Sequence, residues 1–65
     1  MISYEPLRET LKERNMKISD FRGKILSSKT QTSIANDQPV NLSTIEKLCI
    51  ELKVPIEKVV RINYK

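Results

Sequence analysis

The sequence predicts an all-α fold of five short helices, and two observations lead to this prediction. The chain has 65 residues with only one glycine and three prolines, so few residues break its elements. Apolar residues also recur three and four positions apart, which is the spacing of one helix face. A chain of this length buries one modest core. We therefore expect a single domain over residues 1–65, with its core at about 2–60 and a tail at 61–65.

The first helix is expected at about residues 4–14. Tyr4, Leu7 and Leu11 are three and four positions apart and share one apolar face. Ser3, just before them, is a residue type that caps helix N-termini. The other face is charged, as expected for a helix that lies on the surface of a domain.

A short second helix is expected to begin after Ser19, which is a suitable N-cap. Phe21 and Ile25 are four residues apart and share a face. Gly23 lies inside this helix and weakens it by about 1 kcal/mol relative to alanine. The chain then breaks, and Ser27 caps a third helix.

The third helix is predicted at residues 28–36, although its many serines and threonines compete for backbone hydrogen bonds. Two registers are open. Either Gln31 and Ile34 face the core, or Thr32 and Ala35 do. The first is preferred because it buries the larger apolar group.

The fourth helix has the clearest signal in the chain. Asn41 is its expected N-cap, and a continuous apolar stripe follows, in which Cys49 is expected to be a buried thiol. The stripe consists of Leu42, Ile45, Leu48, Cys49 and Leu52.

Pro55 is expected to open a short fifth helix. Its inward side chains would be those of Ile56, Val59 and Val60. The tail at residues 61–65 alternates polar and apolar residues, so an extended conformation is expected there.

Composition excludes several classes of function. The chain has no histidine and one cysteine, so it cannot build a His/Cys zinc site, an internal disulfide or a Ser-His-Asp centre. We expect no enzyme activity, no metal, no cofactor and no small-molecule ligand. No apolar run approaches the ~20 residues of a membrane span. The lone Cys49 fits a reducing compartment, so a cytoplasmic location is expected.

The formal net charge of +4 is unevenly placed. Residues 21–36 hold no acidic residue but contain Arg22, Lys24 and Lys29. The same stretch is rich in small hydrogen-bonding side chains. Such a helix is either a solvated surface element or one that lies in the DNA major groove, where short polar side chains reach base edges.

Three ordered segments decide between these readings. They are Ile2-Ser3-Tyr4-x-Pro6-Leu7, Met16-Lys17-x-Ser19-Asp20-Phe21-Arg22 and Val40-Asn41-Leu42-x-x-Ile45-Glu46-Lys47-Leu48-Cys49. Together they resemble the small single-domain branch of the Cro/C1-type helix-turn-helix domains of phage and bacterial repressors. The resemblance covers about residues 2–60. It implies a five-helix, lambda-repressor-like fold in which helices two and three form the DNA-reading unit.

The resemblance also implies which residues contact DNA. Bases would be read by Ser28, Lys29, Thr32 and Ser33, with Lys29 suited to guanine or to a phosphate. The DNA backbone would be contacted by Lys17, Arg22, Ser27, Thr30 and Asn36. Other roles stay open for the second group. Ser27 also suits an N-cap and Asn36 a C-cap, and Lys17 and Arg22 also suit plain solvated charges.

The resemblance implies a sequence-specific regulator of transcription that binds double-stranded DNA. We expect this regulator to be a repressor of phage or prophage type. The modest charge favours two copies on one DNA site. A homodimer would use the last helix and tail, at Val59, Val60, Ile62 and Tyr64. The alternative is a protein-interaction module of the same fold, such as a regulator's partner or an antitoxin-like binder, with little DNA binding.

Overall fold

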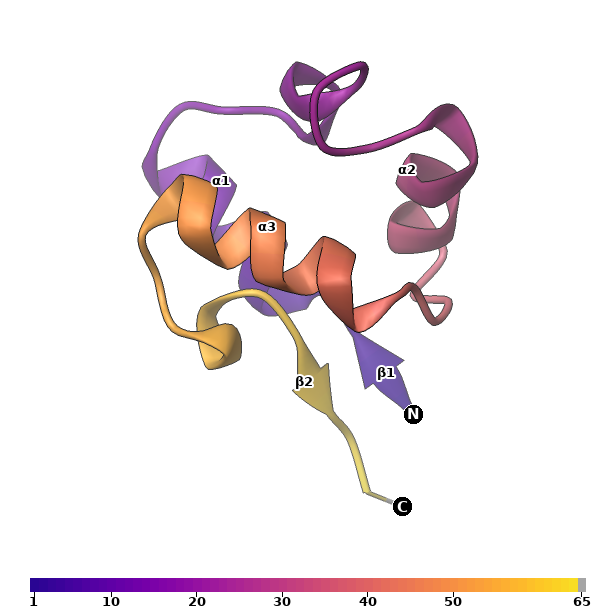
Figure 1. Cartoon of the computed structure of the whole chain (residues 1–65). Coiled ribbons are helices and arrows are strands. Elements are labelled where there is room, and N and C mark those ends of the chain that lie inside the picture. Colours follow the sequence, from indigo (N-terminus) through magenta and orange to yellow (C-terminus); the bar gives the residue numbers. More distant parts are fainter. Residues whose placement is uncertain (65) are drawn as a thin grey trace.

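The computed structural model describes residues 1–64 and contains three α-helices, two single 3-10 turns and a small sheet (Figure 1). In chain order the elements are β1 (Ile2–Ser3), α1 (Glu5–Glu13), η1 (Ile18–Phe21), α2 (Ser28–Ala35), α3 (Leu42–Leu52), η2 (Ile56–Lys58) and β2 (Arg61–Ile62). The predicted first, third and fourth helices are α1, α2 and α3. The prediction of five helices is wrong, because the second and fifth are only 3-10 turns.

The predicted second helix ends at Phe21 because the chain turns sharply there. The carbonyl oxygen of Phe21 accepts three backbone hydrogen bonds, of 3.1, 3.0 and 3.0 Å, from residues 24–26. Gly23 has a φ of 85° and lies in this turn, not inside a helix. Ser19 is not the N-cap, since the turn starts one residue earlier and the carboxylate of Asp20 accepts the backbone N–H of Lys17 at 3.0 Å.

The predicted fifth helix is the three-residue turn η2. Both Val59 and Val60 donate their N–H to the carbonyl of Ile56, and the chain then becomes extended. Val59 is fully buried and Val60 is partly buried. Ile56 was expected to face inward with Val59 and Val60, but its side chain is 49% exposed. A single turn cannot bring these three side chains onto one face.

All three α-helices end in the same way. A left-handed residue lies one or two positions past each helix end: Asn15 and Asp37 have a φ of 55° and Lys53 a φ of 57°. The residues that follow them donate backbone hydrogen bonds of 2.9, 2.8 and 3.1 Å to carbonyls five residues earlier. This is the Schellman arrangement, which satisfies carbonyls that a helix end leaves open.

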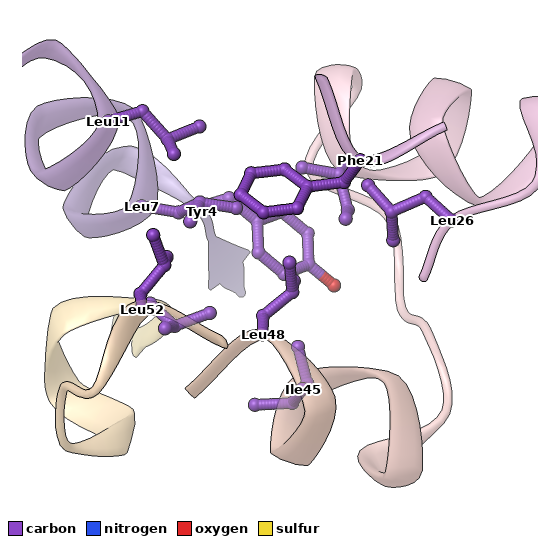
Figure 2. Close-up of a cluster of buried hydrophobic side chains, with 10 residues drawn as sticks. Tyr4, Leu7, Leu11, Phe21, Leu26, Ile45, Leu48 and Leu52 are labelled. Carbon is purple, nitrogen blue, oxygen red and sulfur yellow. The ribbon is translucent and has the colours of Figure 1, made fainter. Parts of the chain in front are cut away.

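The core lies where α1, α3 and the segment from η1 to α2 meet. Figure 2 shows Phe21 and Leu26 pointing toward Tyr4, with Leu48 approaching from α3. The buried apolar side chains are Tyr4, Leu7, Leu11, Phe21, Leu26, Ile34, Ile45, Leu48, Leu52 and Val59. Cys49 is only partly buried, at the margin of this core.

The two ends of the chain form one antiparallel sheet. Ile2 faces Ile62 across it, and Ser3 faces Arg61. The guanidinium of Arg61 also forms an ion pair of 3.0 Å with Glu5. The extended conformation expected for the tail is confirmed at Arg61 and Ile62, whereas its last residue, Lys65, lies outside the described residues.

Candidate nucleic-acid interface

The helix α2 is attached to the core by one apolar side chain. Ile34 is 2% exposed, while Thr32 and Ala35 are exposed. Gln31 is half-buried, and its Oε1 is buried without a hydrogen-bond partner among residues 1–64. The register with Gln31 and Ile34 inward is therefore the observed one. It turns the opposite face of α2 to solvent.

That face carries the residues expected to read bases. Ser28, Lys29 and Thr32 are exposed, and Ser33 is half-buried beside them. The hydroxyl of Thr32 donates its hydrogen to the carbonyl of Ser28 at 3.0 Å. The Thr32 oxygen can therefore only accept any further hydrogen bond. The face is short, polar and cationic at Lys29, which suits contact with the edges of base pairs.

The N-terminus of α2 is capped by Ser27. Its hydroxyl accepts the backbone N–H of Thr30 at 3.2 Å and lies 3.0 Å from the Thr30 hydroxyl. The capping role considered for Ser27 is therefore the one observed. The backbone N–H groups of Ser28 and Lys29 are in the first turn, where a helix supplies no carbonyl for them. They are donors available to an anion at this end of α2.

A polar hollow lies between α2 and the start of α3. It brings three of the expected residues together with the loop that follows α2. Its lining consists of Lys29, Thr30, Ser33, Pro39, Val40, Asn41 and Thr44. Asn41 occupies the N-cap position of α3, but its side chain makes no capping hydrogen bond. Sequence reasoning recognised Asn41 as a cap and missed that it and Thr44 adjoin α2, because that proximity is set by the loop.

The other expected residues are more dispersed. Lys17 and Arg22 flank η1 and are exposed. Asn36 is at the C-cap of α2, the opposite end from Ser27, and its backbone N–H donates to carbonyls of the last turn. The two ion pairs found within residues 1–64 are Arg8–Asp37 and Arg61–Glu5. The cationic side chains of Lys17, Arg22 and Lys29 therefore have no acidic partner in the described part of the chain.

Asp37 holds the carboxyl end of α2 in place and was not recognised from the sequence. Its Oδ1 accepts the backbone N–H of Tyr4 at 2.9 Å and lies 3.4 Å from the guanidinium of Arg8. The hydrogen bond from Tyr4 lowers the pKa of the Asp37 carboxyl. Desolvation opposes this effect, and the hydrogen bond and charge of Arg8 add to the lowering. The Tyr4 hydroxyl donates to the carbonyl of Gln38 at 2.7 Å. Burial, with the nearby Asp37 charge, raises the pKa of this hydroxyl.

Comparison with known proteins decides what this arrangement is. The family model for the Cro/C1-type helix-turn-helix DNA-binding domain matches residues 6–63. The chain belongs to the Cro/C1-type helix-turn-helix family. In this Cro/C1-type domain, η1, the turn at residues 22–27 and α2 stand where the two helices of the motif are expected. The family is one of DNA-binding domains, and the first motif element of this chain is a single 3-10 turn.

A solved structure supports the fold. The crystal structure of the transcriptional regulator VanUg matches this Cro/C1-type domain with a TM-score of 0.90 and 22% sequence identity, covering 98% of this chain and 87% of that chain. No curated protein was found to match. Within residues 1–64, no helix has the length and apolar character needed to span a bilayer. The same residues contain no cluster of three or more His, Cys, Asp or Glu side chains that would suit a metal ion.

Proposed function

We propose that this Cro/C1-type domain is a sequence-specific regulator of transcription that inserts α2 into the major groove of double-stranded DNA. The observation that carries the proposal is the exposed polar face of α2, with its unpaired Lys29, in a chain of a DNA-binding family. The structural match to VanUg, a transcriptional regulator, supports a regulatory role. We propose repression, in a phage or prophage setting, as its mode.

The residues divide into two roles. Ser28, Lys29, Thr32 and Ser33 face the bases, because α2 turns them away from Ile34 and the core. The DNA backbone is held by Lys17, Arg22, Ser27, Thr30 and Asn36, and by Asn41 at the start of α3. Backbone contacts of this kind set the position of α2 in the groove, while the first group supplies selectivity.

Two copies are proposed to act on one site. A net charge of +4 is small, and non-specific affinity of about 10⁻⁴–10⁻⁶ M is usual at physiological salt. A pair of half-sites about one helical turn apart multiplies the weak affinity of each copy. The contact surface is proposed at Val60, Ile62 and Tyr64. Val59, which was expected to contribute, is fully buried in its own core and is not available to a partner.

A protein-interaction module is the second candidate. The observation that favours it is η1, a single turn of four residues where the motif usually has a full helix. Such a module would keep the core and use its exposed surfaces to bind a protein instead of DNA.

Selection of bound sequences from random double-stranded DNA tests the proposal. We expect one enriched motif with two-fold symmetry. The double variant Lys29→Ala, Ser33→Ala should lose preference for that motif, whereas Lys12→Ala, an exposed lysine on α1, should retain it. Thermal unfolding should show that both variants fold. A reporter gene placed behind the motif should be expressed less when the protein is present. No enrichment, or equal preference in the double variant, would favour the interaction module.

A further inference from the structure

We propose that Thr32 selects one A·T base pair in the DNA site, which it recognises by the amino group of adenine and the methyl group of thymine. This role deepens the proposed function and rests on it, because Thr32 meets bases only if α2 enters the major groove. The choice of base pair follows from the groups that Thr32 leaves free.

Thr32 is the residue of α2 that projects farthest from the core. In an ideal helix its side chain lies about 160° around the axis from that of the buried Ile34. The same angle is about 140° for Lys29, about 120° for Ser28 and about 100° for Ser33. Thr32 is exposed and lies near the middle of α2. A base pair that faces the middle of this helix therefore meets Thr32 first.

The hydrogen of the Thr32 hydroxyl is already used within the helix. Its Oγ1 donates to the carbonyl of Ser28, one turn earlier, at 3.0 Å. A hydroxyl has a single hydrogen, so toward DNA this oxygen can only accept a hydrogen bond. The methyl group on the same Cβ takes a different staggered position and stays free for an apolar contact. Thr32 therefore presents an acceptor oxygen and a methyl group to the groove.

The A·T pair is the one that matches both groups. In the major groove adenine presents its N6 amino donor, and thymine presents its C5 methyl group. A G·C pair has the N4 amino donor of cytosine but no methyl group, and its guanine presents two acceptors. An oxygen that cannot donate is opposed by acceptors, unless the Thr32 hydroxyl leaves the carbonyl of Ser28. The oxygen thus favours an amino group, and the methyl group favours thymine.

The other side chains that face the bases have different requirements. In the described part of the chain, the hydroxyls of this region that form hydrogen bonds are those of Ser27, Thr30 and Thr32. The hydroxyls of Ser28 and Ser33 can therefore donate or accept, so they tolerate several bases. Lys29 has only donors and requires an acceptor, such as O6 or N7 of guanine. Lys29 and Thr32 should therefore supply most of the sequence preference of α2, with opposite requirements.

Selection of bound sequences with variants identifies the position that Thr32 reads. Thr32→Ala should lose the preference at one position of the selected motif, and we expect that position to be A·T. The control is Thr30→Ser, on a half-buried hydroxyl that Ser27 contacts. It should keep every preference, because contacts to the DNA backbone carry no sequence information directly.

The outcomes of this selection separate two failures. If the position that depends on Thr32 prefers G·C, or if Thr32→Ala leaves the motif unchanged, the assignment is overturned while DNA reading stands. The absence of any enriched motif would reject the proposed function and the assignment together.

Modified bases test the two contacts of Thr32 separately. Deoxyuridine in place of the thymine removes only the methyl group, so the unmodified chain should bind roughly fourfold more weakly, the effect of about one buried methyl group. Thr32→Ser lacks the side-chain methyl and should bind both DNAs equally. Purine deoxyriboside in place of the adenine removes the N6 amino group. The unmodified chain should then lose roughly fivefold more affinity than Thr32→Val, which keeps methyl groups but has no acceptor.

Equal losses in the unmodified chain and in the variants, for both modified bases, would overturn the proposed contacts. Thermal unfolding should show that the Ala, Ser and Val variants all fold, since Thr32 is exposed.

Discussion

The carboxylate of Asp37 accepts a hydrogen bond of 2.9 Å from the backbone N–H of Tyr4, 33 residues earlier in the chain. The hydroxyl of Tyr4 in turn donates a hydrogen bond of 2.7 Å to the carbonyl of Gln38, the residue after Asp37. These two bonds join the start of α1 to the left-handed turn that ends α2. The orientation of the proposed DNA-reading helix therefore depends on residues that would not touch DNA.

Asp37→Asn should make stability less sensitive to acid. The folded-state pKa of Asp37 is lowered by the Tyr4 hydrogen bond and by Arg8. A lowered carboxyl pKa stabilises the fold above the unfolded pKa of about 3.9, and this stabilisation is lost as pH falls through the folded pKa. We expect the variant to melt below the unmodified chain at pH 7, with the difference shrinking below about pH 4. Glu46→Gln, an exposed carboxyl on α3, is the control and should show no such convergence. A melting difference that stays constant from pH 7 to pH 3 would contradict the assigned ionic contribution.

Lys53→Gly should stabilise the chain. Lys53 has a φ of 57° at the end of α3, where a side chain costs about 1 kcal/mol that glycine avoids. Part of the gain is offset because glycine also loosens the unfolded chain. Urea unfolding should show an increase of roughly 0.5 kcal/mol or more. Lys53→Ala removes the charge but keeps the Cβ, so it should not be stabilising. Equal stabilisation by both variants would point to charge as the cause.

Ile34→Ala should destabilise the fold by about 2–5 kcal/mol, the usual cost of emptying a buried aliphatic site. Ile34 is the only fully buried side chain of α2, so its loss should also detach that helix from the core. Ala35→Ser, on the exposed neighbour, should stay within about 0.5 kcal/mol. Chemical denaturation measures both. Amide exchange of α2 should accelerate in the first variant alone, and equal exchange rates would argue against this anchoring role.

Lys29→Gln and Arg22→Gln should affect DNA binding differently. Lys29 lies on the outward face of α2, so its loss should reduce discrimination at one base pair by about 1–3 kcal/mol. Arg22 lies in the turn before α2, where it suits a phosphate. Its loss should weaken all sequences alike and reduce the salt slope of log K by about 0.9. Titrations at several salt concentrations, on the selected site and on a site with one base pair changed, would separate the two. A uniform loss for Lys29→Gln would reassign it to the DNA backbone.

The sequence predicted the long helices well because their signals are local. The apolar spacing from Tyr4 to Leu11 and from Leu42 to Leu52 identifies α1 and α3, and Ser27 marks the start of α2. The same reasoning failed at Phe21 and Ile25. Two apolar residues four apart fit one turn as well as a helix, and only the folded chain shows that the Phe21 carbonyl closes a turn.

The candidate site likewise has features that the sequence alone predicts and features that only the folded structure shows. The sequence by itself determined a polar, acid-free helix with Lys29 outward in both of its possible registers. It favoured the register with Ile34 inward, and the structure decided for that register, since Ile34 is buried while Thr32 and Ala35 are exposed. Only the tertiary structure decided that Asn41 adjoins that helix, that Asp37 fixes its far end to Tyr4, and that the chain ends pair as a sheet. Helix periodicity depends on residues three or four positions apart, so helices can be predicted from the order of residues along the chain. Contacts between distant residues depend on how the core packs, so they appear only when the elements are assembled.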